Sequence, residues 1–370
     1  MTVTAADHTA GEANVFILSR PHGTVRATGA GTTFTDAYAA ADALRSHSVD
    51  AITGAIGFDR AGRSALVAPA SLVRSSAPVP GSSARPHTVT SRSFSPERTE
   101  HRDRVGRAIK AIADGGLDKV VLARAVDLTV EPDVEVDSLV DALAHGNAEH
   151  NAFAVDVGAV WGDASWLLGS SPEVLLRKEG RVVTCQPYAG SLPRAADPAA
   201  DQAAAETLRT STKDLAEHAF VVDYLRDRLI PLCRELDAPA TPEVRATGEI
   251  WHLATPIRGV LQDDSVTALD LALLLSPTPA VCGTPSDAAA QFITDIEGDR
   301  GLYAGTVGWC DQAGDGEWMV TIRCLQLGAD RRSLRTWAGG GIVAQSDPQA
   351  ELDETTAKLR TVLNALGIAD

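Results

Sequence analysis

Apolar residues recur at helical spacing in the middle of the chain and again at its C-terminus. The central stripe comprises Leu208, Leu215, Ala219, Val222, Leu225 and Leu229. The C-terminal stripe comprises Leu352, Leu359, Val362 and Leu366. Apolar residues at such spacing lie on one face of an α-helix, and that face packs against a core. The pattern therefore predicts one long helix through residues 208–229 and a second helix at the C-terminus.

Each predicted helix carries two carboxylates at the margin of its apolar stripe. Asp214 and Glu217 are three residues apart, and so are Glu351 and Glu354, with Lys358 one turn later. Residues at this spacing share one face of a helix. Burying an unpaired carboxylate is costly, and a divalent cation with oxygen ligands, such as Mg²⁺, would offset that cost. Spacing alone favours a simpler alternative, two amphipathic helices with solvated charges, because such pairs are common on protein surfaces.

Runs rich in β-branched residues predict a series of short strands. These runs cover residues 14–19, 51–58, 117–130, 152–160, 165–168, 174–177, 184–194 and 248–259, and two paired strands cover 301–309 and 318–327 around a hairpin loop at 311–316. Residues 74–95 are rich in Ser, Pro and Arg without periodicity, which predicts a loop. One helix is expected over roughly residues 35–46. Another begins with Ser95 as N-cap and Pro96 as its first residue, and ends at glycines 115–116.

Several residues that could take part in catalysis or binding lie within or beside these apolar runs. Lys119 starts a strand, where a lysine usually extends its charge to solvent but sometimes acts as a base. Glu173 follows a Ser-Ser-Pro turn, which either aims the acid or leaves it exposed. His252 is alone on an apolar strand, and Arg323 lies in a strand where it needs an anionic partner. The glycines at 339–341 predict a loop whose backbone N–H groups could approach an anion, although the signal alone is weak.

Composition excludes several classes of function. The 370 residues are 44% hydrophobic and 22% charged, with a net charge of −16, which argues against binding to nucleic acid or to an anionic membrane surface. No signal peptide and no apolar run long enough to span a bilayer are visible, so a cytoplasmic location is expected. Five scattered cysteines without C-x-x-C spacing predict free thiols in a reducing compartment. Length alone suggests two domains.

Ten segments occur in the order that is typical of one enzyme family. They are KVVLAR, SPE, QPYAGSLPR, KDLAEH, WHLATPI, CGTP, GLYAGTVGW, TIR, AGGGIV and E-x-x-E-T-x-x-K-L. In this order the chain resembles the chorismate-utilising enzymes, and most closely the isochorismate synthases. The resemblance implies one large α/β domain with two stacked, mostly antiparallel sheets and helices outside, in place of two domains. Residues 1–94 would add strands and a connection to the same fold, and residues 95–370 would form the catalytic core.

The resemblance also implies a reaction, the Mg²⁺-dependent isomerisation of chorismate to isochorismate. Water adds at ring carbon 2 and hydroxide leaves carbon 4, so a base and an acid are both needed. Lys119 resembles the general base that activates water. Glu173 resembles the general acid that protonates the departing hydroxyl.

The binding residues are carried over in the same way. Glu217 and Glu354 resemble direct Mg²⁺ ligands, while Asp214 and Glu351 would act through bound waters. Asp214 stands where the family usually has Glu, and its shorter side chain favours a water-mediated contact. The expected substrate contacts are Tyr303 and Arg323 to the enolpyruvyl carboxylate, and Gly190, Ser191, His252, Ala280, Gly339, Gly341 and Lys358 around the substrate and metal.

Related activities remain as alternatives. Salicylate synthases, which eliminate pyruvate from isochorismate, are the nearest, but they carry Thr where this chain has Ala280. Aminodeoxychorismate synthases have a nucleophilic Lys where this chain has Ala189, and anthranilate synthases lack the base that resembles Lys119. No glutaminase subunit is therefore expected, and a monomer is expected. A non-catalytic relative would have lost the base or a metal ligand. The sequence leaves open whether the product serves siderophore, menaquinone or salicylate synthesis.

Overall fold

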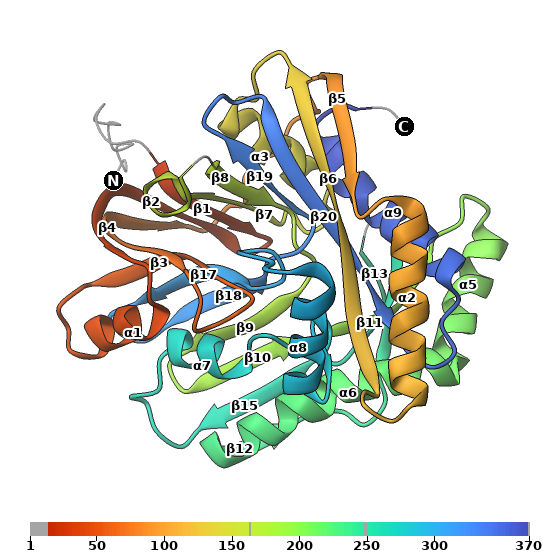
Figure 1. Ribbon diagram of the computed structural model, residues 1–370. Coiled ribbons are helices and arrows are strands. Elements are labelled where there is room, and N and C mark those ends of the chain that lie inside the picture. The colour runs from red at the N-terminus through yellow and green to blue at the C-terminus, as the bar shows by residue number, and fades with distance from the viewer. Residues whose placement is uncertain (1–13, 163, 248–249, 369–370) are drawn as a thin grey trace.

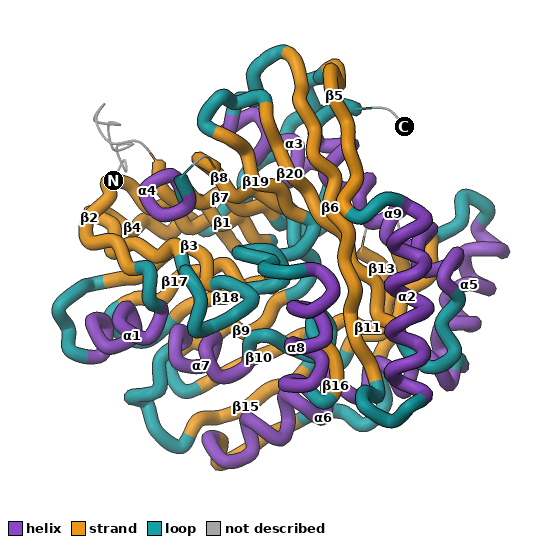
Figure 2. The backbone as a smooth tube through the Cα atoms, in the orientation of Figure 1, coloured by secondary structure: helices purple, strands orange, loops and turns teal. Residues whose placement is uncertain are grey.

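Most strands of the chain join one antiparallel hydrogen-bonded network, and the helices lie around it (Figures 1 and 2). The computed structural model describes residues 14–162, 164–247 and 250–368. Within these residues the network has 17 strands. From one edge the order is β12 (Cys233–Asp237), β15 (Ile257–Leu261), β10 (Val182–Gln186), β9 (Val174–Glu179), β18 (Gly316–Val320), β17 (Thr306–Asp311), β3 (Ala51–Ile56), β4 (Ala65–Ser75), β2 (Gly23–Phe34), β1 (Asn14–Arg20), β7 (Ala152–Asp156), β8 (Ala164–Gly169), β19 (Cys324–Gly328), β20 (Ser333–Ile342) and β6 (Lys119–Glu131).

The far edge of β6 pairs with two further strands, and a small separate sheet lies nearby. Strand β5 (Thr88–Ser95) pairs with the C-terminal part of β6, and β16 (Gly283–Thr284) pairs with its first two residues. The small sheet has the order β11 (Tyr188–Pro193), β14 (Ile250–Ala254) and β13 (Glu243–Thr247). The start of β6 is therefore held between β20 on one side and β16 on the other.

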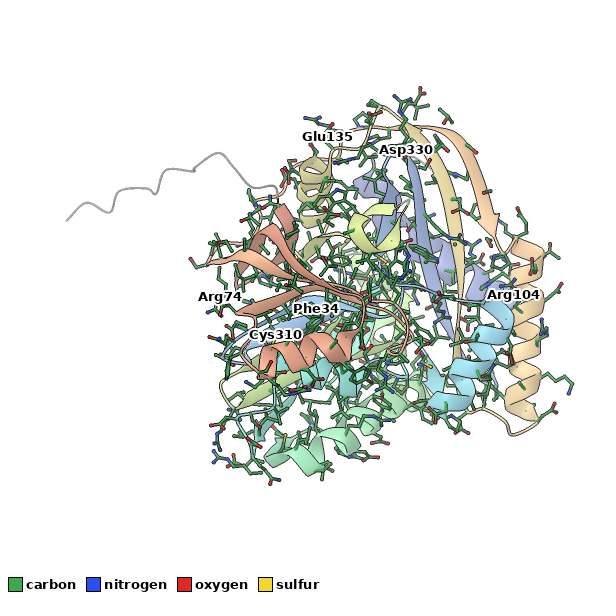
Figure 3. All side chains as sticks on the ribbon, turned by 60° about the vertical axis from the view of Figure 1, so that its left-hand side comes forward. Phe34, Arg74, Arg104, Glu135, Cys310 and Asp330 are labelled. Atoms are coloured by element: carbon green, nitrogen blue, oxygen red, sulfur yellow. The ribbon has the colours of Figure 1, made fainter. Side chains whose placement is uncertain are left out.

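The helices pack against strands along the whole of this strand order. They are α1 (Ala37–Arg45), α2 (Arg98–Ala113), α3 (Val136–His145), α4 (Gly158–Trp161), α5 (Pro198–Thr210), α6 (Thr212–Leu229), the 3-10 turn η1 (Ile230–Leu232), α7 (Ala268–Leu275), α8 (Ser286–Glu297) and α9 (Pro348–Ala365). Helix α9 packs on β20, α2 and α8 pack on β6, and α6 packs on β11. In Figure 3, Arg104 on α2 and Cys310 on β17 lie at opposite sides of the molecule.

Strand β6 contributes to two hydrophobic cores because it is long and buried along most of its length. Near its start, Val120 and Leu122 belong to the larger core. Further along, Val126 and Leu128 belong to a second core beneath α3 and α9. All four are even-numbered, so they lie on one face of the strand. The odd-numbered residues of the strand, beginning with Lys119, point to the opposite face.

Much of the sequence-based assignment is confirmed. The fold is mixed α/β with antiparallel strand pairing and external helices, although hydrogen bonding joins the two expected sheets into one network. All four residues of the C-terminal stripe are buried. The hairpin between β17 and β18 turns at residues 311–316 as predicted. All five cysteines are free and buried. No helix among the described residues is long and apolar enough to cross a bilayer. Residues 1–13, 248 and 249, used in the sequence analysis, lie outside the described residues.

The predicted loop at 74–95 is wrong at both of its ends. Ser75 closes β4, and Thr88–Ser95 form β5. Strand β5 is a polar edge strand, exposed along most of its length, so its residues have no apolar periodicity. The helix that follows is α2, and its N-cap is Glu97, not Ser95, so Pro96 lies outside the helix.

Two continuous elements predicted from periodicity are interrupted. The central helix breaks at Ser211, whose hydroxyl accepts a hydrogen bond from the Asp214 backbone N–H and caps α6. Within α6, Ala219 is exposed and His218 is buried, so the buried face is rotated from the predicted stripe. The strand predicted at 318–327 breaks into β18 and β19, and Arg323 lies in the break, not within a strand.

The run of glycines at 339–341 is not a loop but part of β20, paired along β6. Glycine has low strand propensity, so sequence periodicity could not indicate a strand there. The strand forms because β6 supplies a complete ladder of backbone partners. The glycines leave one face of this sheet without side chains, directly beside the start of β6.

Candidate active site

The residues singled out from the sequence meet where β6, β20, α6, α9 and the small sheet converge. Lys119 Nζ on β6 lies 2.9 Å from Glu217 Oε1 on α6. Ser191 Oγ on β11 donates a hydrogen bond to Glu354 Oε1 on α9, at 3.2 Å. These polar contacts join elements that are far apart in the sequence.

Lys119 is fully enclosed, with 0% of its surface exposed. Its contact with Glu217 lacks hydrogen-bond geometry, and Nζ has no hydrogen-bond partner among the described residues. Gly341 makes room for the pair, because a Cβ there would lie 2.4 Å from Glu217 Oε1 and 3.1 Å from Lys119 Cε. A buried amine with one ionic contact and no hydrogen bond can donate hydrogen bonds to a bound molecule.

Glu173 lies between β8 and β9 and is 4% exposed. Burial raises the pKa of its carboxyl to about 8, although Lys119, a hydrogen bond from the Tyr188 backbone and Lys358 all act to lower it. At neutral pH this carboxyl therefore carries a proton, as a general acid must.

The turn that carries Glu173 is fixed by hydrogen bonds from three directions. The Glu173 backbone N–H donates to Ser171 Oγ at 3.2 Å, and its carbonyl accepts from the Val320 N–H at 3.1 Å. The Ser170 N–H donates to the Arg323 carbonyl at 3.0 Å. The turn thus connects the acid to the segment that carries Arg323.

The four carboxylates on α6 and α9 lie in one region but are not gathered around one point. Among the described residues, no group of three or more His, Cys, Asp or Glu side chains is close enough to hold a metal ion. Glu217 contacts Lys119, and Glu354 lies 2.5 Å from Lys358 Nζ. Burial acts to raise the pKa of Glu354, but Lys358, Ser191 and Lys213 together outweigh it and lower the pKa.

The other two carboxylates repel their neighbours. Burial, followed by the charge of Glu354, raises the pKa of Glu351 to about 7. Burial also raises the pKa of Asp214, with the charges of Glu217 and Glu354 adding to the shift. Glu351 Oε2 is buried without a hydrogen-bond partner among the described residues, and a Cβ at Gly340 would lie 2.8 Å from it. An unpartnered buried carboxylate oxygen among mutually repelling acids fits a hard divalent cation in charge and in ligand type.

Arg323 and Tyr303 form a second polar region. Arg323 has a φ of 51°, a conformation that non-glycine residues rarely adopt, in the break between β18 and β19. Its Nη1 donates to Thr361 Oγ1 on α9 at 3.1 Å, and burial lowers the pKa of its guanidinium to about 10. Tyr303 stacks on Trp337 with ring centroids 5.5 Å apart, and a Cβ at Gly339 would lie 3.0 Å from its hydroxyl. The arginine stays cationic at neutral pH and can pair with an anion.

The small sheet supplies three of the predicted contacts. Ser191 pairs with His252 across β11 and β14, next to a register shift at Gly190, which has a φ of 71°. A Cβ at Gly190 would lie 2.8 Å from Asp214 Cβ. Burial, Arg323 and Lys358 lower the pKa of His252 to about 3, so the ring is neutral. Its Nε2 has no hydrogen-bond partner among the described residues.

Lys358 and Ala280 lie on segments that are attached to β20 and β6, respectively. Lys358 Nζ donates to the Gly339 carbonyl at 2.9 Å and so attaches α9 to β20. Ala280 is partly buried in the turn between α7 and β16. This turn is attached to β6, because the Val121 N–H donates to the Cys282 carbonyl at 2.8 Å.

Sequence reasoning missed Glu297 and Arg300, which form a buried ion pair at 2.9 Å. Arg300 donates to the carbonyls of Val121 and Val281, each at 2.8 Å, and Glu297 Oε1 accepts from the Ala123 N–H at 2.7 Å. The pair therefore ties β6, just after Lys119, to the turn that carries Ala280. The only signal in the sequence was an acid three residues before an arginine, which is common on helix surfaces.

Comparisons with known proteins identify the family. Residues 68–367 match the family model described as "Chorismate binding enzyme". The chain belongs to the chorismate-binding enzyme family. Over 364 residues it is 45% identical to a putative isochorismate synthase, MenF, of Mycobacterium tuberculosis, which covers 95% of this chain and 96% of that protein. It is 44% identical over 324 residues to the isochorismate synthase DhbC of Bacillus subtilis, covering 86% and 81%.

A solved structure of this family has the same fold. The chain superposes on a putative 2,3-dihydroxybenzoate-specific isochorismate synthase, DhbC, from Bacillus anthracis, with a TM-score of 0.89 and 35% identity over 96% of each chain. The mixed α/β architecture expected from the ten segments is therefore that of a chorismate-binding enzyme.

Proposed function

We propose that this protein is an enzyme that isomerises chorismate to isochorismate. The observation that carries the proposal is a fully buried lysine, Lys119, at one site with a carboxyl, Glu173, that burial keeps protonated near neutral pH. The relatives that match nearly the whole chain are named isochorismate synthases, which supports the choice of reaction.

Each of these two groups would carry out one of the two proton transfers in the reaction. Lys119 takes a proton from water, whose oxygen bonds to ring carbon 2. Both ring double bonds shift by one position, the bond from carbon 4 to its hydroxyl breaks, and Glu173 protonates the departing oxygen to give water. One water is consumed and one is released, so the substrate is isomerised without a net loss of atoms.

Mg²⁺ is proposed as the cofactor, bound directly by Glu217 and Glu354 and through waters by Asp214 and Glu351. When bound, the ion would neutralise the clustered acids and one carboxylate of the dianionic substrate. As a metal ligand, Glu217 would exchange its contact with Lys119 for one with the metal. Glu354 would likewise exchange its contact with Lys358 for one with the metal.

Substrate recognition is proposed to rest on charge and close approach. Arg323 and Tyr303 would hold the enolpyruvyl carboxylate, since a guanidinium binds a carboxylate through two parallel hydrogen bonds. The residues that would line the remainder of the substrate are Gly190, Ser191, His252, Ala280, Gly339, Gly341 and Lys358. Neutral His252 can accept or donate a hydrogen bond without adding charge.

The wider setting is also proposed. Residues 1–94 would belong to the same fold as the catalytic residues 95–370. The enzyme would act as a cytoplasmic monomer without a glutaminase subunit, because water rather than ammonia is the nucleophile. Its product would feed siderophore or menaquinone synthesis.

Replacing the two proposed catalytic groups tests this assignment. Lys119→Ala and Glu173→Gln should each lower kcat by roughly 10²–10⁴, the usual contribution of general acid–base catalysis. Chorismate binding, measured by calorimetry, should change little, because neither group is a main holder of the carboxylates. Near-normal turnover in either variant would refute that residue's role.

A further inference from the structure

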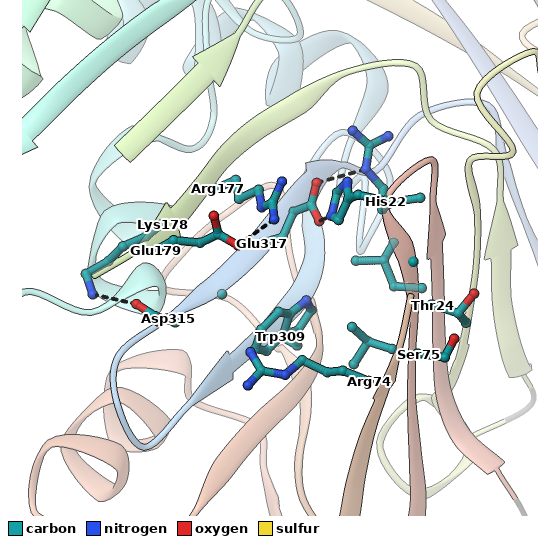
Figure 4. A pocket seen from close by; sticks show the side chains of 15 residues that line it. His22, Thr24, Arg74, Ser75, Arg177, Lys178, Glu179, Trp309, Asp315 and Glu317 are labelled. Atoms are coloured by element: carbon teal, nitrogen blue, oxygen red, sulfur yellow. Dashed lines mark hydrogen bonds and ion pairs between the residues drawn. The ribbon is translucent and has the colours of Figure 1, made fainter. Parts of the chain in front are cut away.

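Arg20, the last residue of β1, is a buried cation far in sequence from the active-site segments. Its Nε donates to Glu317 Oε1 at 2.8 Å, and its Nη1 donates to Asn151 Oδ1. Glu317 is 3% exposed, and its Oε2 also lies 3.2 Å from His22 Nε2. Figure 4 marks this contact with a dashed line. Burial acts to raise the pKa of Glu317, but His22 and Arg20 outweigh it and lower the pKa. Arg20 is therefore held at one end by an ionised carboxylate.

The other end of Arg20 leads to the turn that carries Glu173. Asn151 Nδ2 donates to the Ser171 carbonyl at 3.2 Å, and the Asn151 backbone carbonyl accepts from Ser170 Oγ at 2.7 Å. Ser171 Oγ in turn accepts from the Glu173 N–H. One buried asparagine thus contacts both serines that precede Pro172 and the acid.

These contacts form a closed network, which runs from Arg20 through Glu317 and β18 to Glu173, and back through Ser171 and Asn151. Glu317, which anchors Arg20, and Val320, whose N–H binds the Glu173 carbonyl, lie on the same strand, β18. Strand β18 pairs with β9, the strand that begins directly after Glu173. The backbone of Glu173 is therefore held from one side through β18 and from the other through Asn151, and Arg20 joins the two.

We propose that Arg20 and Asn151 are positioning residues for Glu173, fixing its backbone so that its carboxyl meets the hydroxyl that leaves carbon 4. This inference rests on the proposed function. Neither residue contacts the site itself. A mutation far from the reacting atoms that misplaces a catalytic group by about 1 Å can lower a rate by about 10²-fold. Weakening this network should therefore lower turnover without removing a substrate contact. The N-terminal strand β1 thereby contributes to catalysis.

The first variant is Arg20→Gln, which cannot bridge Glu317 and Asn151 in the same way. A cavity of about 200 Å³ borders both Arg20 and Glu317 (Figure 4), so water can solvate Glu317 in the variant and folding is expected. The second variant is Asn151→Asp, which keeps the acceptor for Arg20 but loses the donor to the Ser171 carbonyl. The matched control is Arg26→Gln, an exposed arginine on the next strand of the same hairpin.

We expect Arg20→Gln and Asn151→Asp each to lower kcat by about tenfold or more with KM changed by less than about twofold. Arg26→Gln should leave both constants unchanged. In a Glu173→Gln background, adding Arg20→Gln or Asn151→Asp should cause no further loss, because residues that act through one group are not additive.

If Arg20→Gln or Asn151→Asp lowers kcat by the same factor in the wild-type and the Glu173→Gln backgrounds, the residue supports the fold in general rather than Glu173. That result would overturn the proposal. An impaired Glu173→Gln enzyme beside an unimpaired Arg20→Gln or Asn151→Asp enzyme would overturn the positioning role alone. A fully active Glu173→Gln enzyme would overturn the acid assignment and the positioning role together. If Arg20→Gln does not fold, Asn151→Asp measured in the wild-type and Glu173→Gln backgrounds decides whether the network positions Glu173.

Discussion

The ammonium nitrogen of Lys119 lies 2.9 Å from Oε1 of Glu217, so the proposed base and a proposed metal ligand hold each other. The same relationship recurs on α9, where Lys358 lies 2.5 Å from Glu354. Each of the two carboxylates proposed as direct metal ligands is thus paired with a lysine. A cation bound at Glu217 would therefore compete with Lys119 for the same carboxylate. The proposed metal site and the proposed base are coupled through this contact.

Metal removal should abolish activity. Excess chelator should reduce chorismate turnover to background, and added Mg²⁺ should restore it. Glu217→Gln and Glu354→Gln should each be more damaging than Asp214→Asn, because the first two are proposed as direct ligands and the third acts through water. The measurement is turnover against Mg²⁺ concentration for each variant. Full activity in chelator would exclude the metal site.

The pH dependence should follow the raised pKa of Glu173. The protonated carboxyl is the working acid, and burial raises its pKa to about 8, so kcat should fall as pH rises through about 8. A pH–rate profile of the metal-loaded enzyme tests this. If kcat of a Glu173→Gln variant still falls as pH rises through about 8, the fall belongs to a different group.

Stability should depend on the same titration. The pKa of Glu173 is raised from 4.5 to about 8 in the folded state, so the folded chain binds more protons in that interval. Its contribution to the free energy of unfolding is therefore present below about pH 4.5 and lost as pH rises through about 8. Urea unfolding of the metal-free protein across this interval should show a smaller decline for Glu173→Gln than for wild type. An equal decline in both would contradict the burial-driven shift.

Gly341→Ala should inactivate the enzyme. Its Cβ would lie 2.4 Å from Glu217 Oε1 and 3.1 Å from Lys119 Cε, so both groups would be displaced. The matched control is Gly106→Ala in α2, where a Cβ would meet nothing within 4 Å. The control should keep full activity and gain about 0.5–1 kcal/mol of stability, since alanine is a better helix former. Equal activity of the two variants would contradict the close approach of β20 to the base.

Ala280→Thr should alter the product ratio. Salicylate-forming relatives are expected to carry Thr at this position, where a hydroxyl could retain isochorismate for pyruvate loss. One hydrogen bond contributes only about 0.5–1.5 kcal/mol net, so the variant should release measurable pyruvate while isochorismate stays the main product. Pyruvate can be followed with a coupled lactate dehydrogenase assay. Unchanged pyruvate would show that this position does not control partitioning.

The sequence was informative where local pattern and local structure agree. The apolar stripe of α9 and the three-residue spacing of Glu351 and Glu354 were visible because a helix repeats regularly. The break at Ser211 was also encoded, since a Ser three residues before Asp214 is a helix-start signal that the apolar periodicity obscured.

Long-range contacts set the features that sequence pattern missed. The glycines at 339–341 form a strand only because β6 supplies its partners, and Arg323 has positive φ only because the turn at Ser170 and helix α9 hold it from two sides. Arg20 is connected to the acid through Asn151 and Ser171 and through Glu317 on β18, which no local pattern connects. The residue types of the site could be predicted, but the network that positions them could not.

Product analysis of the wild-type protein tests the central claim most directly. Purified protein is incubated with chorismate and Mg²⁺ without ammonia, with a chelated sample as control, and the products are separated by chromatography. The proposed mechanism predicts isochorismate as the main product, little or no salicylate or pyruvate, and no conversion in chelator. Salicylate with an equal amount of pyruvate as the main product, or no conversion of chorismate at all, would contradict it.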